Sequence, residues 1–284
     1  MQANVRQVFY FHTDAVSLGG FVEEPFRYIP TPSSVALSSA GGSVRSRAGE
    51  FGFEDVISCR SSYTHTSGRP AKQNGPWTSR STAVVEGLNI LGRVTADRIV
   101  ARIHMEHTEA GDGRRRISFA GTQFEGLRLD GKQLDLSLNQ VLLPKHGREF
   151  DVYNEDESLD AELESAALWR TAHAQANAIA KGKDTPEWAR ARFGWAAKKG
   201  NSEAANEEGY AICSLVDRID GAPSGQVLAH SLELPEVGRF FFGEAVVFPH
   251  SLQLAMVRAE LGCATTGQTV VAMARVNGST CPPG

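Results

Sequence analysis

Two stretches of the chain, residues 5–150 and 210–280, are rich in β-branched residues and alternate apolar with polar positions. The clearest alternation sets apolar Ile99, Ala101, Ile103 and Met105 against polar Arg98, Arg102, His104 and Glu106. A period of two places successive side chains on opposite faces of a strand, so that one face is buried and the other meets water. This pattern predicts a mainly antiparallel β structure.

Turn-forming residues divide the first stretch into hairpins. Asp130-Gly131 separates residues 127–129 from the alternating residues 134–138, and such a dipeptide is a strong hairpin signal. Residues 109–113 are expected to close another hairpin into residues 114–119.

Two segments of the first stretch contain many polar and turn-forming residues. Residues 29–50 are expected to be irregular, with a short strand near Val35 and Leu37. Residues 60–80, which include Asn74-Gly75-Pro76, are expected to form a long surface loop.

The second stretch predicts five strands, over residues 210–216, 225–234, 239–248, 251–261 and 269–276. The segment 251–261 is apolar on both faces near Ala255 and Val257. A strand of this kind is typical of the centre of a sheet.

Between the two stretches, residues 156–205 change to a helical period. A first helix is predicted from the apolar positions Leu159, Leu163, Ala166 and Ala167. Acidic residues 155–157 precede it and suit the dipole at a helix N-terminus. Asp184-Thr185-Pro186-Glu187 predicts the start of a second helix that runs to about Lys199. Trp188 and Trp195 share one face of this helix, and packing against the sheet or the first helix is favoured over a ligand platform.

These elements predict an antiparallel β-sandwich with an inserted two-helix block at 156–205. The chain has 284 residues, and single β-rich domains of this size are common. We therefore expect one domain over residues 1–284, in which residues 82–139 and 210–276 fold together and the helices pack onto them.

Charge and hydropathy exclude two classes of partner. The chain has 29 basic and 33 acidic residues, so its formal charge of −4 does not favour nucleic acid. The triplet Arg114-Arg115-Arg116 lacks neighbouring aromatic residues, and protection of an edge strand by charge is favoured over nucleic-acid contact. No run of 18 apolar residues occurs, so no membrane-spanning helix is expected.

Four cysteines are distant in the sequence and form no paired zinc motif: Cys59, Cys213, Cys263 and Cys281. Their even number allows two disulfides, with Cys263–Cys281 as the first pair to test. The alternative, slightly favoured because residues 1–7 contain no secretory signal, is four free thiols.

His104 and Glu106 form the one candidate metal site. Residues two apart on a strand share a face, so both side chains could bind a divalent cation together with a further ligand from elsewhere. His107 would point to the opposite, apolar face. The alternative is a solvated strand face on which these residues alternate with Arg98 and Arg102.

No catalytic motif occurs in the chain. A Gly-x-Ser-x-Gly elbow and a glycine-rich phosphate loop are both absent, so no cofactor is expected and the catalytic residues stay unknown. Glu244 and Glu260 are carboxylates on predicted strands, but the distance between two carboxylates depends on the fold.

Three segments together resemble one bacterial family. Residues 14–43 contain Leu-Gly-Gly, Pro-Thr-Pro-Ser and Gly-Gly-Ser; residues 82–97 contain Val-Val-Glu-Gly-Leu-Asn-Ile-Leu-Gly; and residues 121–129 read Gly-Thr-Gln-Phe-Glu-Gly-Leu-Arg-Leu. In order and spacing they are similar to the choice-of-anchor P proteins over the first half of the chain.

That resemblance implies a β-rich extracellular or cell-surface module of unknown activity, without known catalytic residues. The chain departs from the family in its helical block and in showing no export signal or sorting tail. A cytoplasmic location is the alternative.

Two functions follow as expectations. The first is a binding or structural module that contacts a protein partner, a glycan or further copies of itself. The alternative is an enzyme that acts on carbohydrate or a small hydrophobic substrate in a cleft between the sheet and the helical block. A deep pocket with convergent polar groups of perturbed pKa would favour the enzyme.

Overall fold

The computed structural model describes residues 8–70, 77–107, 115–144, 163–199, 210–248, 251–263 and 265–281. Over these residues the chain is mainly β, with antiparallel strands in two large sheets and two helices. The predicted antiparallel β-sandwich with a two-helix insertion is confirmed.

The first large sheet contains ten strands in the described part of the chain. They are β1 (Val8–Phe11), β2 (Asp14–Glu23), β3 (Phe26–Ile29), β4 (Ser34–Ala36), β17 (Ala211–Ser214), β19 (Gln226–Leu228), β20 (Ser231–Leu234), β21 (Gly238–Val247), β22 (Ser251–Cys263) and β23 (Thr265–Cys281). The main path has the order β19-β20-β21-β22-β23-β2-β3. β22 lies between β21 and β23, as its apolar sequence predicts.

The second large sheet contains eleven strands within the same described ranges. They are β5 (Gly42–Ala48), β6 (Phe51–Phe53), β7 (Ile57–Cys59), β8 (Ser61–Pro70), β9 (Trp77–Ile90), β10 (Val94–His107), β11 (Arg115–Ser118), β12 (Gln123–Glu125), β13 (Arg128–Leu129), β14 (Lys132–Gln133) and β16 (Leu163–Glu164). Its main path is β14-β13-β10-β9-β7-β6. A separate pair joins β15 (Asp135–Leu138) to β18 (Val216–Asp220).

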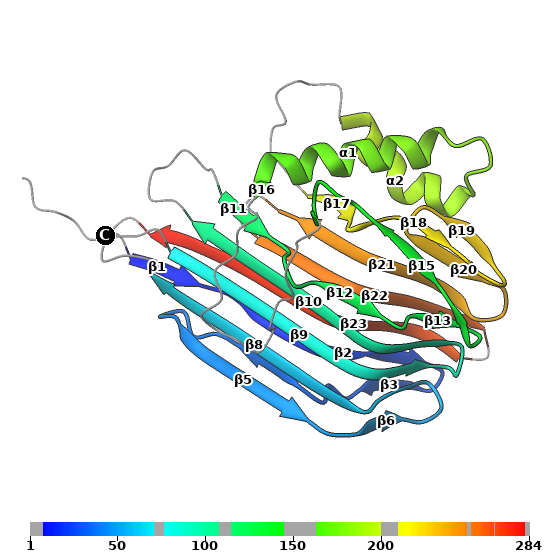
Figure 1. The fold of residues 1–284 in the computed structure, drawn as a ribbon, viewed down its shortest axis with the longest axis horizontal. Helices are drawn as coiled ribbons and strands as arrows, with labels where there is room; N and C mark the ends of the chain where they lie inside the picture. The colour runs from blue at the N-terminus through cyan, green and yellow to red at the C-terminus, as the bar shows by residue number, and fades with distance from the viewer. Residues whose placement is uncertain are drawn as a thin grey trace, which may run out of the picture.

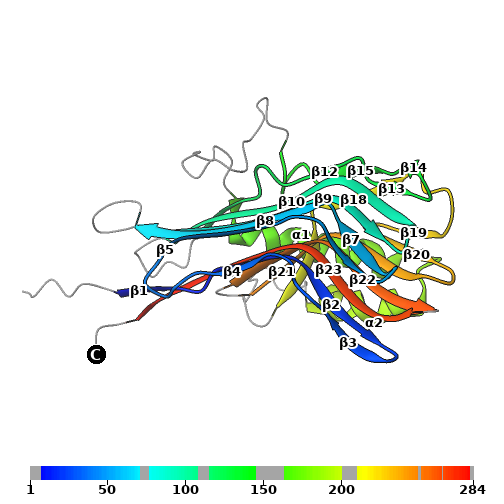
Figure 2. The same ribbon diagram turned by 90° about the horizontal axis from the view of Figure 1, so that it is seen from below.

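The two large sheets lie face to face. Figure 1 looks onto the eleven-stranded sheet with the ten-stranded sheet behind it, and Figure 2 shows the two layers from the side. The helices α1 (Ser165–Lys181) and α2 (Glu187–Lys199) lie at one edge, beside β17 and β21 (Figure 1). Neither helix is long and apolar enough to cross a membrane.

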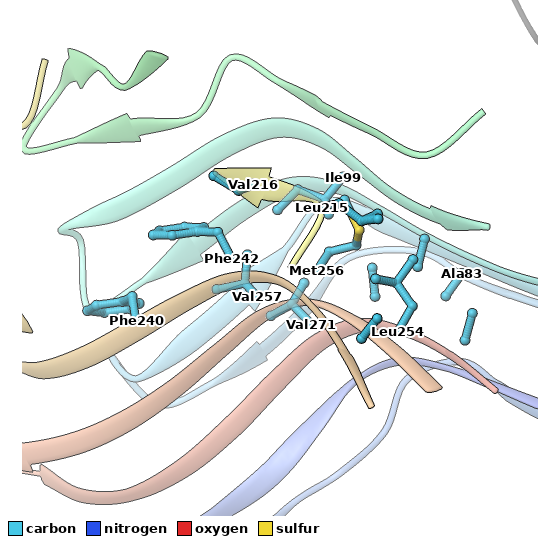
Figure 3. Close-up of a cluster of buried hydrophobic side chains, with 14 of the residues drawn as sticks. Ala83, Ile99, Leu215, Val216, Phe240, Phe242, Leu254, Met256, Val257 and Val271 are labelled. Carbon is cyan, nitrogen blue, oxygen red and sulfur yellow. The ribbon is translucent and has the colours of Figure 1, made fainter. Parts of the chain in front are cut away.

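One large hydrophobic cluster fills the space between the sheets. Figure 3 shows Phe242, Met256 and Val257 of the ten-stranded sheet near Ala83 and Ile99 of the other. The cluster draws residues from both sequence stretches and from α1, which contributes Leu168, Trp169 and Ala172. That the whole chain forms a single domain stays a prediction, and the shared core supports it.

The prediction for β10 is confirmed for one face only. Its alternating apolar side chains belong to this core, but the opposite face does not meet water throughout, because Val100 and Arg102 on that face are fully buried. The turn at Asp130-Gly131 is also confirmed: it joins β13 to β14, and both residues have positive φ angles, as a tight two-residue hairpin turn requires. The hairpin is shorter than predicted, because residues 135–138 form β15 and pair with β18 instead.

The loop predicted for residues 60–80 is wrong. β8 and β9 pair over most of this segment, and only residues 71–76, with Asn74-Gly75-Pro76, lie outside the described residues. The inward positions of β8 are occupied by small hydroxyl residues such as Thr64, which hydrogen-bonds to Ser33 (2.7 Å). Because these buried positions are polar, the sequence lacks the hydrophobic alternation of a strand.

The predicted helical block begins too early. Leu163 lies in β16, which pairs with β11, and α1 then runs from Ser165 to Lys181. The second helix is confirmed. The hydroxyl of Thr185, a residue of its predicted start, donates instead to the carbonyl of Ile179 at the end of α1 (2.6 Å). Residues 155–157, Leu159 and the 109–113 turn lie outside the described residues.

The arginine triplet does not protect an edge strand. β11, which contains Arg115 and Arg116, pairs with β10 on one side and β16 on the other. Arg114 lies outside the described residues. The short strand β16 could not be predicted, because only two residues of it pair.

The proposed Cys263–Cys281 disulfide is ruled out by the backbone. Cys263 pairs with Thr265 at one end of the 17-residue β23, and Cys281 lies at the other end. At a rise of about 3.3 Å per residue these positions are roughly 50 Å apart, whereas a disulfide needs Cα atoms within about 7 Å. Cys59 and Cys213 are free and buried, as the free-thiol alternative expects.

Replacing Phe242 with alanine should destabilise the protein by about 3–5 kcal/mol, because the ring is fully buried between the sheets. The matched control Phe26→Ala removes a ring that is 56% exposed and should cost less than about 0.5 kcal/mol. Urea unfolding followed by circular dichroism measures both values. A single transition at all wavelengths is expected for one domain, and two separate transitions would contradict it.

Candidate functional site

His104 and Glu106 lie on the face of β10 that points away from the core, as predicted. Their cross-strand neighbours are cationic: His104 pairs with Arg80, and Glu106 pairs with Arg116. Burial, together with the charges of Arg80, Arg102 and Arg69, lowers the pKa of His104 to about 4. Guanidinium groups around the imidazole disfavour a divalent cation.

His107 lies on the opposite face, also as predicted. Its ring packs against Phe9 with centroids 4.7 Å apart, and its Nε2 atom lies 3.2 Å from the Ser79 hydroxyl. Burial lowers the pKa of His107 to about 3, with smaller effects from Arg115 and His104. In the ranges that the structure describes, no group of three or more His, Cys, Asp or Glu residues could hold a metal ion.

The densest chemistry lies on the other sheet, around Glu244 of β21. This carboxylate is only 3% exposed. It accepts hydrogen bonds from Nε of Arg258 on β22 (2.8 Å) and from Nη2 of Arg192 on α2 (3.0 Å). The Nε2 atom of His230 lies 3.3 Å from the same carboxylate.

A change of phase in β21 places Glu244 on the outer face, the face of the ten-stranded sheet that points away from the core. Phe240 and Phe242 point into the core and Phe241 points outward, so strict alternation would send Glu244 inward. Gly243 has φ +63°, a conformation that favours glycine, and the alternation shifts at this residue. Glu244 therefore shares the outer face with Phe241.

Phe241 is the centre of contact between α2 and the sheet. The guanidinium of Arg258 lies 3.9 Å from its ring centroid and that of Arg192 lies 4.6 Å away. The ring of Trp188 meets it edge-on at 5.9 Å. These cation–π and aromatic contacts fill the space between α2 and the sheet.

The ion pairs continue along the outer face to Glu233. Nη1 of Arg258 donates to Glu260 (2.6 Å), and Arg239 lies between Glu260 (3.7 Å) and Glu233 (3.1 Å). The indole N–H of Trp188 donates to the second oxygen of Glu233 (3.1 Å). We call this set the ionic network; its members are Trp188, Arg192, His230, Glu233, Arg239, Glu244, Arg258 and Glu260.

The network holds Glu244 in its ionised form. Burial by itself raises the pKa of this carboxyl, but the hydrogen bond from His230 and the charges of Arg258, His230 and Arg192 outweigh it and lower the pKa to about 2. A carboxylate with such a pKa is a poor general base near neutral pH. Its geometry suits a structural clamp on α2 better than proton transfer.

A pocket of about 770 Å³ opens beside the network, at the end of the ten-stranded sheet. Its polar lining includes Glu233, Arg239 and Glu260 of the network, together with Gln226 and Glu236. Its walls also contain Gly225, Gly238 and Gly262, and no lining residue comes from a helix. The pocket therefore presents fixed carboxylate and guanidinium groups to solvent.

The sequence identified part of this site. Glu244 and Glu260 were candidate carboxylates, and the structure connects both through Arg258. Trp188 packs against the sheet, as predicted, whereas the side chain of Trp195 lies outside the described residues. Arg192, His230, Glu233 and Arg239 were missed; the one available signal was the charged pair Arg258 and Glu260 within an apolar strand.

The two buried cysteines do not add a reactive group. Burial raises the pKa of Cys59 to about 11. Burial, followed by the charge of Glu244, raises the pKa of Cys213 to about 12. Both thiols stay protonated near neutral pH and are poor nucleophiles.

Zinc should not stabilise the protein through His104, because the nearby arginines repel a divalent cation. In differential scanning fluorimetry, each protein, wild type and His104→Ala, is expected to melt at the same temperature with zinc chloride as with a chelator. A zinc-dependent increase that is lost in His104→Ala would establish a metal site there.

Glu244→Gln should destabilise the protein by about 3 kcal/mol near pH 7, because Arg192 and Arg258 lose a buried counter-charge. Since folding lowers the pKa of Glu244 from 4.5 to about 2, its contribution is present above pH 4.5 and is lost as the pH falls toward 2. Urea unfolding at several pH values should show the difference between wild type and variant shrinking over this interval. A difference that stays constant down to pH 2 would refute the clamp.

Comparison with protein families gives one match, a domain of unknown function (DUF8256), over residues 9–248. The match ends before β22, which carries Arg258 and Glu260, and before β23. No curated protein and no solved structure matches the chain. Because the family match covers well over half of its residues, the protein belongs to the family described as a domain of unknown function, DUF8256.

Proposed function

We propose that the protein is a β-sandwich binding module that recognises a hydroxyl-rich ligand in the pocket beside the ionic network. The observation that carries this proposal is the set of polar groups in the pocket: Glu233, Arg239 and Glu260 are each about one-third exposed and held by ion pairs. Binding sites with few, rigidly placed polar groups fix the orientation of a ligand.

The ion pairs leave part of each group available. Carboxylates have about four lone-pair sites and arginine has five N–H donors, so each can serve the network and a ligand together. Hydroxyl groups both donate and accept, which matches a wall on which acceptors and donors alternate. A sugar or another polyol has this chemistry.

The geometry favours binding over catalysis. The cleft expected between the sheet and the helical block is occupied by Trp188, Phe193 and Arg192. The carboxyl group with the most strongly lowered pKa, Glu244, does not line the pocket. A surface location, which the resemblance to choice-of-anchor P proteins implies, is part of the same proposal.

Filling the pocket should abolish binding without disturbing the fold. A Cβ atom at Gly262 would meet only Gly238 Cα at 3.9 Å, so the backbone has room for a side chain there, and the ring of Gly262→Phe should obstruct the pocket. Gly49→Phe is the matched control, because Gly49 has open space and lies far from the pocket in the chain and in the fold. Saturation-transfer NMR with neutral mono- and disaccharides should show contact for wild type and Gly49→Phe and lose it for Gly262→Phe.

Wild-type protein that shows no contact with any sugar of the panel would overturn the proposed ligand class. Equal contact by wild type and Gly262→Phe would place the ligand elsewhere.

A further inference from the structure

One row of side chains crosses all seven strands on the main path of the ten-stranded sheet. Successive members are direct cross-strand partners, and we call them the outer row: Tyr28, Phe21, Gln268, Glu260, Arg239, Glu233 and Gln226. Directly opposite residues share a face, here the outer one. Six strand intervals of about 4.8 Å give a length of about 29 Å.

The outer row joins the pocket to an aromatic end. Gln226, Glu233, Arg239 and Glu260 line the pocket, and Gln268 continues the row in an exposed position. At the far end, the rings of Phe21 and Phe26 lie 5.7 Å apart, and those of Phe26 and Tyr28 lie 5.0 Å apart. Polar hydrogen-bonding groups and flat apolar rings therefore follow one another along one line.

The aromatic end is unusually open to solvent. Tyr28 is 73% exposed and Phe26 is 56% exposed, the highest values for any aromatic residue in the described ranges. Clustered rings left in water indicate a contact surface. β3, which carries Phe26 and Tyr28, is the last strand on the main path of the sheet, so no further strand of that path covers the cluster.

Most charges along the row are paired within the ionic network, which has three arginines and three glutamates, and Glu236 in the pocket lining adds one negative charge. Arg239 is paired with Glu233 and Glu260, and Arg192 and Arg258 balance Glu260 and Glu244. The remaining polar members, Gln226 and Gln268, carry no charge. A charged ligand would find little net attraction here, whereas a neutral one meets both donors and acceptors.

We propose that the outer row is an extended binding track for a neutral polysaccharide, with Phe21, Phe26 and Tyr28 as a stacking platform for its sugar rings. This inference rests on the proposed function and extends it from the pocket to the whole sheet face. The apolar face of a sugar ring packs on an aromatic ring, and its hydroxyl groups bond to the amide, carboxylate and guanidinium groups of the row.

The continuity of the row distinguishes this ligand from a second copy of the chain. Pairing through β3 would cover the edge strand and its rings, but it would not use the pocket, which begins at Glu260, three strand intervals or about 14 Å from Tyr28, and ends at Gln226, about 29 Å away. A long, flexible and neutral chain can contact every member. The experiment therefore has to distinguish polysaccharide binding from dimerisation through β3.

The test compares Tyr28→Ala with Tyr210→Ala. Tyr210 is a suitable control because it is also an exposed aromatic residue, 46% exposed, but lies outside the outer row. Affinity electrophoresis in gels with soluble β-glucan, xylan or galactomannan gives the dissociation constant from the loss of mobility. We expect at least one polysaccharide to retard wild type and Tyr210→Ala equally, and Tyr28→Ala to bind about tenfold more weakly.

The remaining variants and ligands separate the outcomes. Gly262→Phe should also weaken polysaccharide binding, whereas Gly49→Phe should not. If Tyr28→Ala binds the polysaccharide as wild type does while Gly262→Phe does not, the track is refuted and the pocket proposal stands. If none of the polysaccharides retards wild type although short sugars contact the pocket, the track is refuted as well.

Two further results would overturn the inference. Stronger retardation by an acidic polysaccharide such as polygalacturonate would contradict a neutral ligand. In sedimentation velocity, wild-type dimers that become monomers in Tyr28→Ala would show that a second copy covers the aromatic end. A monomer in both samples is expected.

Discussion

The burial of two long apolar sheet faces against each other is the constraint on which the rest of the structure depends. β9 and β10 have 14 residues each and β23 has 17, and their inner positions form one continuous hydrophobic cluster. Because these faces hold the core, charged groups are placed on the outer faces. The open edge near β11 and β17 is closed by α1, whose Leu168 and Trp169 join the same cluster.

The outer face of the ten-stranded sheet carries the ionic network. Glu244 reaches this face because the phase of β21 shifts at Gly243, and α2 is held over it by Arg192 and Trp188. A buried set of balanced charges contributes more to the position of a helix than to net stability, since desolvation offsets much of the Coulomb attraction. The same ion pairs orient Glu233, Arg239 and Glu260 at the rim of the pocket.

This organisation favours the proposed binding function over proton transfer. Its most buried carboxylate is saturated by cationic partners, and its accessible carboxylates are fixed by arginines. Fixed donors and acceptors with balanced charge are suited to a neutral ligand. The exposed rings at the other end of the outer row extend this surface beyond the pocket.

Features that depend on local periodicity could be predicted from the sequence. The apolar face of residues 98–106, the turn at Asp130-Gly131, the central position of 251–261 and the second helix each follow from neighbouring residues, and the structure contains all of them. The second face of 98–106 is more buried than its polar residues predict. Residues 60–80 were misassigned because the buried positions of β8 are small hydroxyl residues, which do not produce a hydrophobic pattern.

Which charged residues contact one another depends on the three-dimensional fold and could not be predicted from the sequence. Glu244 was expected on a strand, but its face depends on the phase shift at Gly243, and its partner Arg192 is more than 50 residues away in the chain. The outer row joins Tyr28 to Gln226 through the register of seven strands. Such contacts depend on how distant strands pair, and pairing is determined by the burial of whole sheet faces rather than by any local stretch of sequence.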